Sequence, residues 1–306
     1  MIVIKKILVI IVSILAILFI SILGFFLTTN SEVEQPTTTE EVTNEEIDDD
    51  NEEITEEETE SVVTNEDPVR EFLSEKLKKA VRNFFQRDLY VVSIGDSLTE
   101  GVGDDKENGG YVGVLEETIN QEEQLVTIEN FGRRGNRTDQ LIKRLEEEED
   151  VIKAVDQADI IFITIGANDI MQVFKDNFTN LNLDQFTSEQ IRYEQRLNKI
   201  FSTLQEINPD ATIYLIGFYN PFREYFPDIE ELEYIVDSWN QIGLDVTGQY
   251  EHIHYIPIKD LFEDPYTEFF ADDNFHPNHI GYKKIAERIL NYLTNEGEDN
   301  AFQADQ

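Results

Sequence analysis

Two distant segments of the sequence carry the residue types that nucleophilic catalysis needs. Ser97 follows Gly95 and Asp96 at the end of an apolar run, and a serine at a strand end is exposed where backbone N–H groups can gather around a developing oxyanion. His276 comes three residues after Asp273, so on a turn the carboxylate can hold one imidazole nitrogen while the other faces the serine. Each segment alone also fits a helix cap or a turn. Together they predict a nucleophile, a general base and an orienting acid.

Two further segments offer groups that could stabilise an oxyanion. Asn168 lies in the stretch Gly166–Asp169 after another apolar run, and its side-chain amide donates hydrogen bonds without carrying a charge. The alternative is a turn in which Asp169 caps the next helix. Gly132 and Gly135 follow the second apolar run, where a glycine permits close approach to a substrate or supplies a turn with positive φ. The residues alone do not decide between the two glycines.

The other histidines suggest neither a second catalytic pair nor a strong metal site. His254 has Glu251 three residues before it, but in a strand this offset places the two side chains on opposite faces. His252 and His254 share a face and are compatible with a metal ion, yet no third ligand is in view and the chain has no cysteine. We expect a polar edge strand there, no metal and no cofactor.

The elements that must position these residues are a sheet and the helices that cover it. Apolar runs rich in Val and Ile alternate with helical patterns, which is typical of β-α-β units. Strands are predicted at Leu89–Ile94, Leu125–Glu129, Asp159–Ile165, Thr212–Gly217 and Ile253–Ile256. Helices are predicted at Arg70–Phe85, Tyr111–Asn120, Thr138–Glu147, Glu189–Asn208, Glu231–Tyr250 and Ile280–Asn295. The expected fold is a three-layer α/β/α sandwich with a five-stranded, mainly parallel sheet, whose ligands bind at the C-terminal strand ends, where the motifs lie.

Taken together, the motifs resemble the sequence blocks of the SGNH (GDSL) hydrolase family of lipases, acylhydrolases and esterases. The matching stretches are Gly95–Leu98 for the nucleophile block, Gly135 for the glycine block, Gly166–Asp169 for the G-x-N-D block and Asp273–His276 for the D-x-x-H block. The resemblance covers about Tyr90–Leu293. The glycine block departs from the pattern, because Gly132 is also available and the family does not require the arginines beside it.

The resemblance implies a flavodoxin-like fold and a role for each matched residue. Ser97 would be the nucleophile, His276 the general base and then acid, and Asp273 its orienter. The oxyanion hole would be formed by the Ser97 N–H, the Gly135 N–H and the Asn168 side chain. The implied reaction is hydrolysis of a carboxylic ester through an acyl-enzyme, without a cofactor. Lysophospholipids, thioesters and O-acetylated cell-wall or extracellular polysaccharides lie within the implied substrate range. A non-catalytic surface-display module is the alternative outside enzymology.

Two groups of side chains are candidates for substrate binding. Tyr219 and Phe222 follow the fourth predicted strand and would line an acyl or sugar site, or else pack against their own loop. Three arginines lie beside the proposed oxyanion glycine: Arg133, Arg134 and Arg137. They would attract an anionic ester, or only balance acids such as Glu129 and Asp139.

Composition excludes other classes of function. The 306 residues include 64 acids, 24 bases and no cysteine, which gives a formal charge of −40. We expect no nucleic-acid partner, because affinity for phosphates comes from clustered Lys and Arg. The lack of cysteine excludes a disulfide framework and any metal site built on thiolates.

The chain is expected to have three regions, 1–29, 30–68 and 69–306. Ile7–Leu27 is uncharged and about 31 Å long as a helix, enough to cross a hydrocarbon core of about 30 Å. We therefore expect a membrane anchor. Because Lys5 and Lys6 precede the apolar run, the catalytic domain should lie outside the cell. The alternative is a cleaved signal segment and secretion. Residues 30–68, with 17 acids and no bases, should form a disordered linker. Residues 69–306 should form one hydrolase domain, which we expect to be monomeric.

Overall fold

The computed structural model describes residues 88–304, except 122, 178, 181, 224, 226–229 and 265–267. The predicted N-terminal span, the acidic linker and the predicted helix at 70–85 lie outside these residues. Within the described part of the chain, no helix combines the length and apolar character needed to cross a membrane. The described elements all belong to one unit, Asn65–Gln306.

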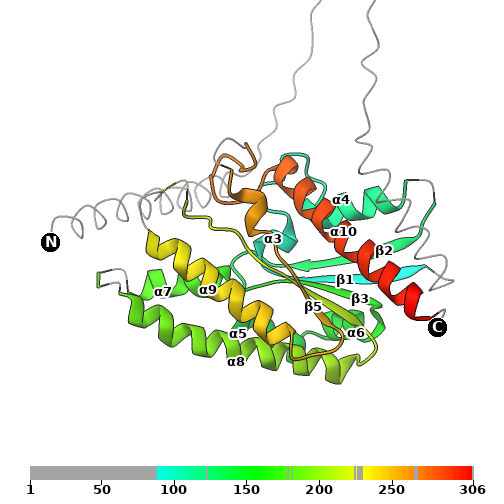
Figure 1. Cartoon of the computed structure of the whole chain (residues 1–306), viewed down its shortest axis with the longest axis horizontal. Helices are drawn as coiled ribbons and strands as arrows, with labels where there is room; N and C mark the ends of the chain where they lie inside the picture. Colours follow the sequence, from blue (N-terminus) through cyan, green and yellow to red (C-terminus); the bar gives the residue numbers. More distant parts are fainter. Residues whose placement is uncertain are drawn as a thin grey trace, which may run out of the picture. The chain divides into compact units, whose positions relative to one another are not determined.

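Five parallel strands form a single sheet (Figure 1). They are β1 (Leu89–Gly95), β2 (Val126–Gly132), β3 (Ile160–Thr164), β4 (Thr212–Ile216) and β5 (Ile253–Ile256), in the spatial order β2-β1-β3-β4-β5. The strand order therefore reverses at β1, because β2 lies on one side of it and β3 on the other. Ligands of such sheets bind at the C-terminal strand ends beside this switch point. The predicted fold class is confirmed, with every pairing in this sheet parallel.

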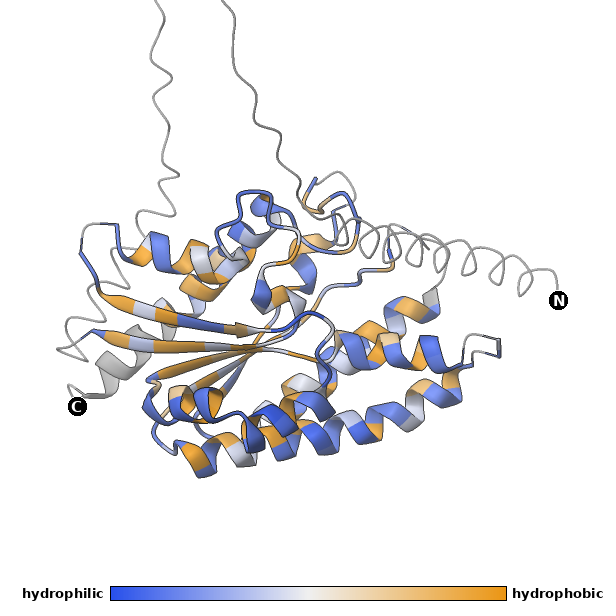
Figure 2. Ribbon diagram, turned by 180° about the vertical axis from the view of Figure 1, so that it is seen from behind, coloured by the Kyte–Doolittle hydropathy of each residue, from blue (hydrophilic) through white to orange (hydrophobic). Residues whose placement is uncertain are grey.

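The central strands are buried because helices cover both faces of the sheet. Every residue of β3 is buried, whereas the edge strand β2 alternates between buried and exposed positions. Successive side chains of a strand point to opposite faces of the sheet, so neighbouring residues enter different hydrophobic cores. Ile161 and Ile163 enter one core, and Ile160 and Phe162 enter the other. Figure 2 shows the strands mostly in the colour of hydrophobic residues, between helices that carry both colours.

The helices form two outer layers. On one side of the sheet lie α5 (Thr138–Glu147), α6 (Glu149–Gln157), α7 (Ala167–Asp176), α8 (Leu183–Ile207) and α9 (Glu230–Thr247). On the other lie α3 (Ser97–Glu100), α4 (Gly110–Ile119), the 3-10 helix η1 (Lys259–Phe262) and α10 (His279–Ala304). The sequence pattern predicted α5 at its observed bounds, but it did not predict α6 or α7 as separate helices and began α8 six residues too late.

Candidate active site

Ser97 lies two residues after the end of the inner strand β1. Gly95 ends this strand with a φ of 149°, and a Cβ there would come within 2.1 Å of the carbonyl oxygen of Thr164, so glycine is needed for β1 to approach β3. Asp96 then caps α3 by accepting the Leu98 N–H at 3.1 Å. Ser97 is thereby the first helical residue, at the C-terminal edge of the sheet.

Asp96 also anchors a chain of buried hydroxyl groups. Its carboxylate accepts a hydrogen bond from Thr164 Oγ1 at 2.9 Å. Thr164 Oγ1 lies 2.7 Å from Thr99 Oγ1, which in turn lies 2.9 Å from the hydroxyl of Tyr111. Burial raises the pKa of Asp96 to about 6, although the Leu98 N–H and the Thr164 hydroxyl act against the rise. These contacts tie the turn before Ser97 to β3 and α4.

The segment before α10 folds into a tight turn around Asp273. One carboxylate oxygen of Asp273 accepts the backbone N–H groups of Phe275 and His276, at 3.0 and 2.9 Å. Asn274 lies inside this turn with a φ of 46°, a left-handed conformation that asparagine tolerates better than most residues. The Tyr219 hydroxyl donates to the Phe275 carbonyl oxygen at 2.7 Å, which fixes the turn to the loop after β4.

Ser97, His276 and Asp273 form one continuous hydrogen-bonded series. His276 Nδ1 lies 2.6 Å from Asp273 Oδ2, and His276 Nε2 lies 3.0 Å from Ser97 Oγ. Burial acts to raise the pKa of Asp273, but the hydrogen bonds from the imidazole and the backbone N–H of His276 outweigh it and lower the pKa to about 2. An ionised Asp273 accepts a hydrogen bond from Nδ1–H, and the lone pair of Nε2 is then free to accept a hydrogen bond from the Ser97 hydroxyl.

A small cavity of about 30 Å³ lies beside Ser97 and His276. Its walls come from the C-terminal ends of β1, β3 and β4 and from the turn before α10. The lining residues are Asp96, Ser97, Leu98, Thr164, Ile165, Ala167, Asn168, Ile216, Gly217, Phe218, Tyr219, Pro221, Phe275 and His276. A wider polar groove of about 390 Å³ lies along α7 and α8, and neither Ser97 nor His276 lines it. We place the chemistry at the smaller cavity, because it contains the reactive side chains.

The proposed oxyanion donors occupy different positions relative to this cavity. Asn168 lines it, and one hydrogen of its amide is donated to the carbonyl oxygen of Asn136 at 3.1 Å. The Gly132 N–H is donated to Asn130 Oδ1 at 2.8 Å, whereas the Gly135 N–H has no acceptor among the described residues. Gly135 has a φ of 76°, and a Cβ there would meet no heavy atom within 4 Å. Neither glycine lines the cavity, and the available N–H favours Gly135 over Gly132 as a donor.

The arginines beside Gly135 have acidic partners or no partner, and none lines the small cavity. Arg133 forms two hydrogen bonds with the Glu148 carboxylate, at 2.8 and 3.2 Å. Arg137 pairs with Asp139 at 3.0 Å. The Arg134 side chain has no ion pair among the described residues. The contacts of Arg133 and Arg137 favour charge balance over attraction of an anionic ester.

Of the two aromatic candidates for substrate binding, Tyr219 lies at the small cavity and Phe222 lies in the hydrophobic core. Tyr219 lines the small cavity and packs against Phe262, with ring centroids 4.3 Å apart. Phe222 instead packs in the hydrophobic core against Phe174, with ring centroids 5.1 Å apart. His254 stacks on Tyr214. Across the described residues, no group of three or more His, Cys, Asp or Glu side chains could hold a metal ion.

Sequence reasoning missed the two functions of Asp96, as helix cap and as anchor of the buried hydroxyl groups. The signal for the cap was present, since an aspartate at a strand end before a helix is a preferred N-cap residue. The link to Thr164 depends on the pairing of β1 with β3, which a local pattern does not specify.

Comparisons with known proteins identify the family of this chain. The model of the GDSL-like lipase/acylhydrolase family matches residues 93–284. The uncharacterized protein YpmR of Bacillus subtilis (strain 168) is 34% identical over 228 residues, which cover 73% of this chain and 89% of that protein.

Two solved structures of esterases and lipases share the fold. The lipase Lip_vut3 from a goat rumen metagenome has a TM-score of 0.57 and 24% identity, covering 66% of this chain and 95% of its own. A variant of Axe2, an acetyl-xylooligosaccharide esterase from Geobacillus stearothermophilus, has a TM-score of 0.51 and 22% identity, covering 68% and 94%. The family model spans more than half of the chain and includes Ser97 and His276. The chain therefore belongs to the GDSL-like lipase/acylhydrolase family and is a hydrolase of ester bonds.

Proposed function

We propose that this hydrolase works through an acyl-enzyme on Ser97, with His276 as base and Asp273 as its orienting acid. The observation that carries the proposal is the continuous series in which Ser97 Oγ, the imidazole and the Asp273 carboxylate are joined at 3.0 and 2.6 Å. A serine hydroxyl is a weak nucleophile until a neighbouring base takes its proton. His276 is the base in contact with it, and its other nitrogen is occupied by the carboxylate.

The mechanism has two symmetrical halves. Ser97 Oγ attacks the ester carbonyl carbon while its proton moves to His276 Nε2, and the carbonyl π electrons become an oxyanion. The tetrahedral intermediate collapses, the alkoxide leaves with the proton from Nε2, and the acyl group remains on Ser97. Water then attacks this acyl-enzyme with the same proton path, which releases the acid and restores the hydroxyl. The free hydrogen of the Asn168 amide and the backbone N–H groups of Ser97 and Gly135 are proposed to bind the oxyanion.

We further propose that the acyl group is short, with acetyl as the best fit. The cavity beside Ser97 and His276 is small, about 30 Å³, and a short acyl group needs the least room there. Its apolar walls, such as Leu98, Ile165 and Ile216, suit the methyl end of an acetate. This size favours O-acetyl esters of glycans or small molecules over lysophospholipids. A similar fold occurs in Axe2, whose described substrates are acetylated xylooligosaccharides.

The mechanism is tested by Ser97→Ala and His276→Ala in the purified chain, with hydrolysis of an aryl acetate as the readout. Each variant is expected to lose roughly 10⁶-fold in kcat, because nucleophile and base act as one unit. Circular dichroism and thermal unfolding serve as controls that the fold is intact. A folded variant with activity near that of the wild type would exclude this mechanism.

The substrate proposal needs a separate panel. Aryl esters of acetate, butyrate, octanoate and palmitate are compared by kcat/KM, together with an acetylated xylooligosaccharide. We expect kcat/KM to fall as the acyl chain lengthens beyond what the cavity holds. A preference for octanoate or palmitate would exclude the acetyl assignment and leave the mechanism untouched.

A further inference from the structure

The buried carboxylate of Asp169 connects the two segments that supply the proposed oxyanion donors. Asp169 is 1% exposed and follows Asn168 in the first turn of α7. One of its oxygens accepts the backbone N–H of Thr138 at 3.1 Å, and the other accepts the Thr138 hydroxyl at 2.5 Å. Thr138 begins α5 and lies three residues after Gly135. A single side chain therefore fixes the start of α5 to the start of α7.

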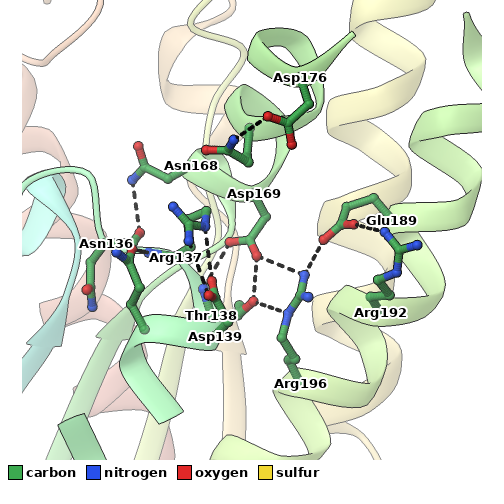
Figure 3. Close-up of polar contacts among 12 residues, drawn as sticks. Asn136, Arg137, Thr138, Asp139, Asn168, Asp169, Asp176, Glu189, Arg192 and Arg196 are labelled. Carbon is green, nitrogen blue, oxygen red and sulfur yellow. Dashed lines mark hydrogen bonds and ion pairs between the residues drawn. The ribbon is translucent and has the colours of Figure 1, made fainter. Parts of the chain in front are cut away.

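A second contact runs in parallel with the first. Asn168 Nδ2 donates to the carbonyl oxygen of Asn136 at 3.1 Å, and Asn136 is the neighbour of Gly135 (Figure 3). Two adjacent residues of α7 thus bind the loop before α5, at Asn136, and the first residue of α5, Thr138. This double connection sets the position of the Asn168 amide relative to the Gly135 N–H.

Arg196 of α8 completes the connection. Its Nε donates to Thr138 Oγ1 at 2.6 Å, and its Nη2 donates to Asp169 Oδ1 at 3.0 Å (Figure 3). Burial raises the pKa of Asp169, and the hydrogen bonds of Thr138 and the charge of Arg196 act against this rise. Arg196 also pairs with Glu189, which lies about two turns earlier on the same face of α8. The guanidinium fork holds Thr138 and Asp169 at the same time, which a single point charge does not reproduce.

We propose that Thr138, Asp169 and Arg196 are positioning residues that preorganise the oxyanion hole. None of the three touches the small cavity, so they act through Asn168 and the Gly135 loop. The inference rests on the proposed acyl-enzyme mechanism and extends it to residues outside the sequence motifs. Its physical basis is that oxyanion donors lower the barrier only when they are held in place before the charge develops, and a misplacement of about 1 Å can cost about 100-fold in rate.

The test compares two arginines that share a partner. Arg196→Gln removes the contacts with Thr138 and Asp169 as well as that with Glu189. Arg192→Gln is the matched control, because Arg192 pairs with Glu189 at 2.8 Å without contacting Asp169, and the change in charge is the same. Thr138→Val removes the hydroxyl with its hydrogen bonds to Asp169 and from Arg196, and keeps the ion pair between Arg196 and Asp169; it serves if Arg196→Gln does not fold. Thr138→Ser keeps the hydroxyl and is the conservative rescue.

Two readouts separate positioning from general stability. The first is kcat and KM for an aryl acetate. The second is inhibition by an aryl trifluoromethyl ketone, which Ser97 Oγ attacks at the carbonyl carbon to form a hemiketal whose oxyanion occupies the proposed hole. We expect Arg196→Gln to lower kcat about 10- to 100-fold at a nearly constant KM. The inhibition constant of the ketone should rise by a similar factor. Thr138→Val should lower kcat and raise the inhibition constant of the ketone as well, each by a smaller factor than Arg196→Gln. Arg192→Gln and Thr138→Ser should match the wild type.

The outcomes distinguish this inference from the proposed function. The positioning role is excluded if the folded variants Arg196→Gln and Thr138→Val both keep the wild-type kcat. It is also excluded if they lose kcat while the ketone inhibits them as strongly as the wild type. An equal loss in Arg192→Gln would also exclude it, since the effect would then come from Glu189 or from net charge. If the wild type and Ser97→Ala hydrolyse the acetate equally, it is the acyl-enzyme mechanism that fails.

Discussion

At the scale of single residues, Asp96 combines a structural contact with an electrostatic cost. Its ordinary pKa of 3.8 is raised to about 6 by burial, so the folded protein binds a proton at Asp96 more tightly than the unfolded chain does. The ionised carboxylate therefore disfavours folding above about pH 6, by about 3 kcal/mol for such a shift. The cost declines as pH falls toward 4, where the group is protonated in the folded state, and it disappears below the unfolded pKa.

This sign leads to a prediction for Asp96→Asn. Both hydrogen bonds of the side chain, from the Leu98 N–H and the Thr164 hydroxyl, go to Oδ1, and an asparagine oxygen can accept both. We expect the variant to be more stable than the wild type at pH 7, by up to about 3 kcal/mol, with the difference shrinking toward pH 4. Urea unfolding at the two pH values measures it. A variant that is less stable than the wild type at pH 7 would contradict the burial argument.

Asp273 shows the opposite sign and a different role. Its pKa is lowered from 3.8 to about 2, so its contribution to stability is present above about pH 4 and is lost as pH falls from about 4 to about 2. We expect Asp273→Asn to lower kcat on the order of 10⁴-fold, because the asparagine amide donates to His276 Nδ1 and leaves the proton on Nε2, facing Ser97. Steady-state kinetics on an aryl acetate measure this loss. Retention of kcat within a few-fold would show that the carboxylate does not set the imidazole tautomer.

At the scale of elements, glycines decide how closely the strands and helices approach the site. A Cβ at Gly132 would lie 2.1 Å from the backbone nitrogen of Glu100, so an alanine there must force β2 and α3 apart. Because α3 carries Ser97, we expect Gly132→Ala to cost about 3 kcal/mol or more in stability and to lower kcat. Thermal unfolding and aryl acetate kinetics measure the two effects.

Gly135→Ala is the matched control for this prediction. Its added Cβ would meet nothing within 4 Å, and only the positive φ of 76° carries a cost, about 1–2 kcal/mol. The variant keeps the backbone N–H, so it should keep most of the activity. A larger loss of stability in Gly135→Ala than in Gly132→Ala would show that backbone conformation outweighs steric contact in this loop.

The sequence predicted the strands more reliably than the helix boundaries. Strands such as β3 are continuous apolar runs because both faces are covered, and this pattern is visible without the structure. The separate helix α6 was missed because Glu148 is both the C-cap of α5 and the N-cap of α6, with no Gly or Pro to mark the break. The early start of α8 depends on a capping box between Asn182 and Gln185, which precedes the clearly amphipathic part of the helix.

The part of the site that depends on contacts local in the sequence could be predicted, whereas the part that depends on helix packing could not. The spacing of Asp273 and His276 sets a local contact, and the sequence shows it directly. The contact between His276 and Ser97 joins residues 179 positions apart, so it followed only from the expectation that parallel strands end at one edge. The link from Arg196 to Asp169 depends on how α8 packs beside α7, and no pattern in the sequence specifies it.

At the scale of the whole molecule, charge is distributed unevenly along the chain. Residues 69–306 carry 47 acids and 22 bases, a net charge of −25, and residues 30–68 add 17 acids without a base. The small cavity is nevertheless lined mainly by apolar side chains. Arg133 and Arg137 pair with acids, and neither they nor Arg134 line the cavity. A neutral acetyl ester suits this arrangement better than an anionic substrate, because the field of the molecule repels anions.

The last prediction concerns residues 1–68, which the described structure does not include. We propose that 1–29 anchors the chain in the membrane and that 30–68 tethers the hydrolase domain outside the cell, as the uncharged run Ile7–Leu27 and the acidic stretch indicate. Esterase activity should then sediment with membranes, and protease added to intact cells should cleave first within 30–68 and release an active soluble fragment. An unstructured tether of this length reaches about 35 Å, enough for a protease to enter between domain and bilayer. Recovery of a soluble secreted form that begins near Thr29, without added protease, would instead show that the segment is a cleaved signal.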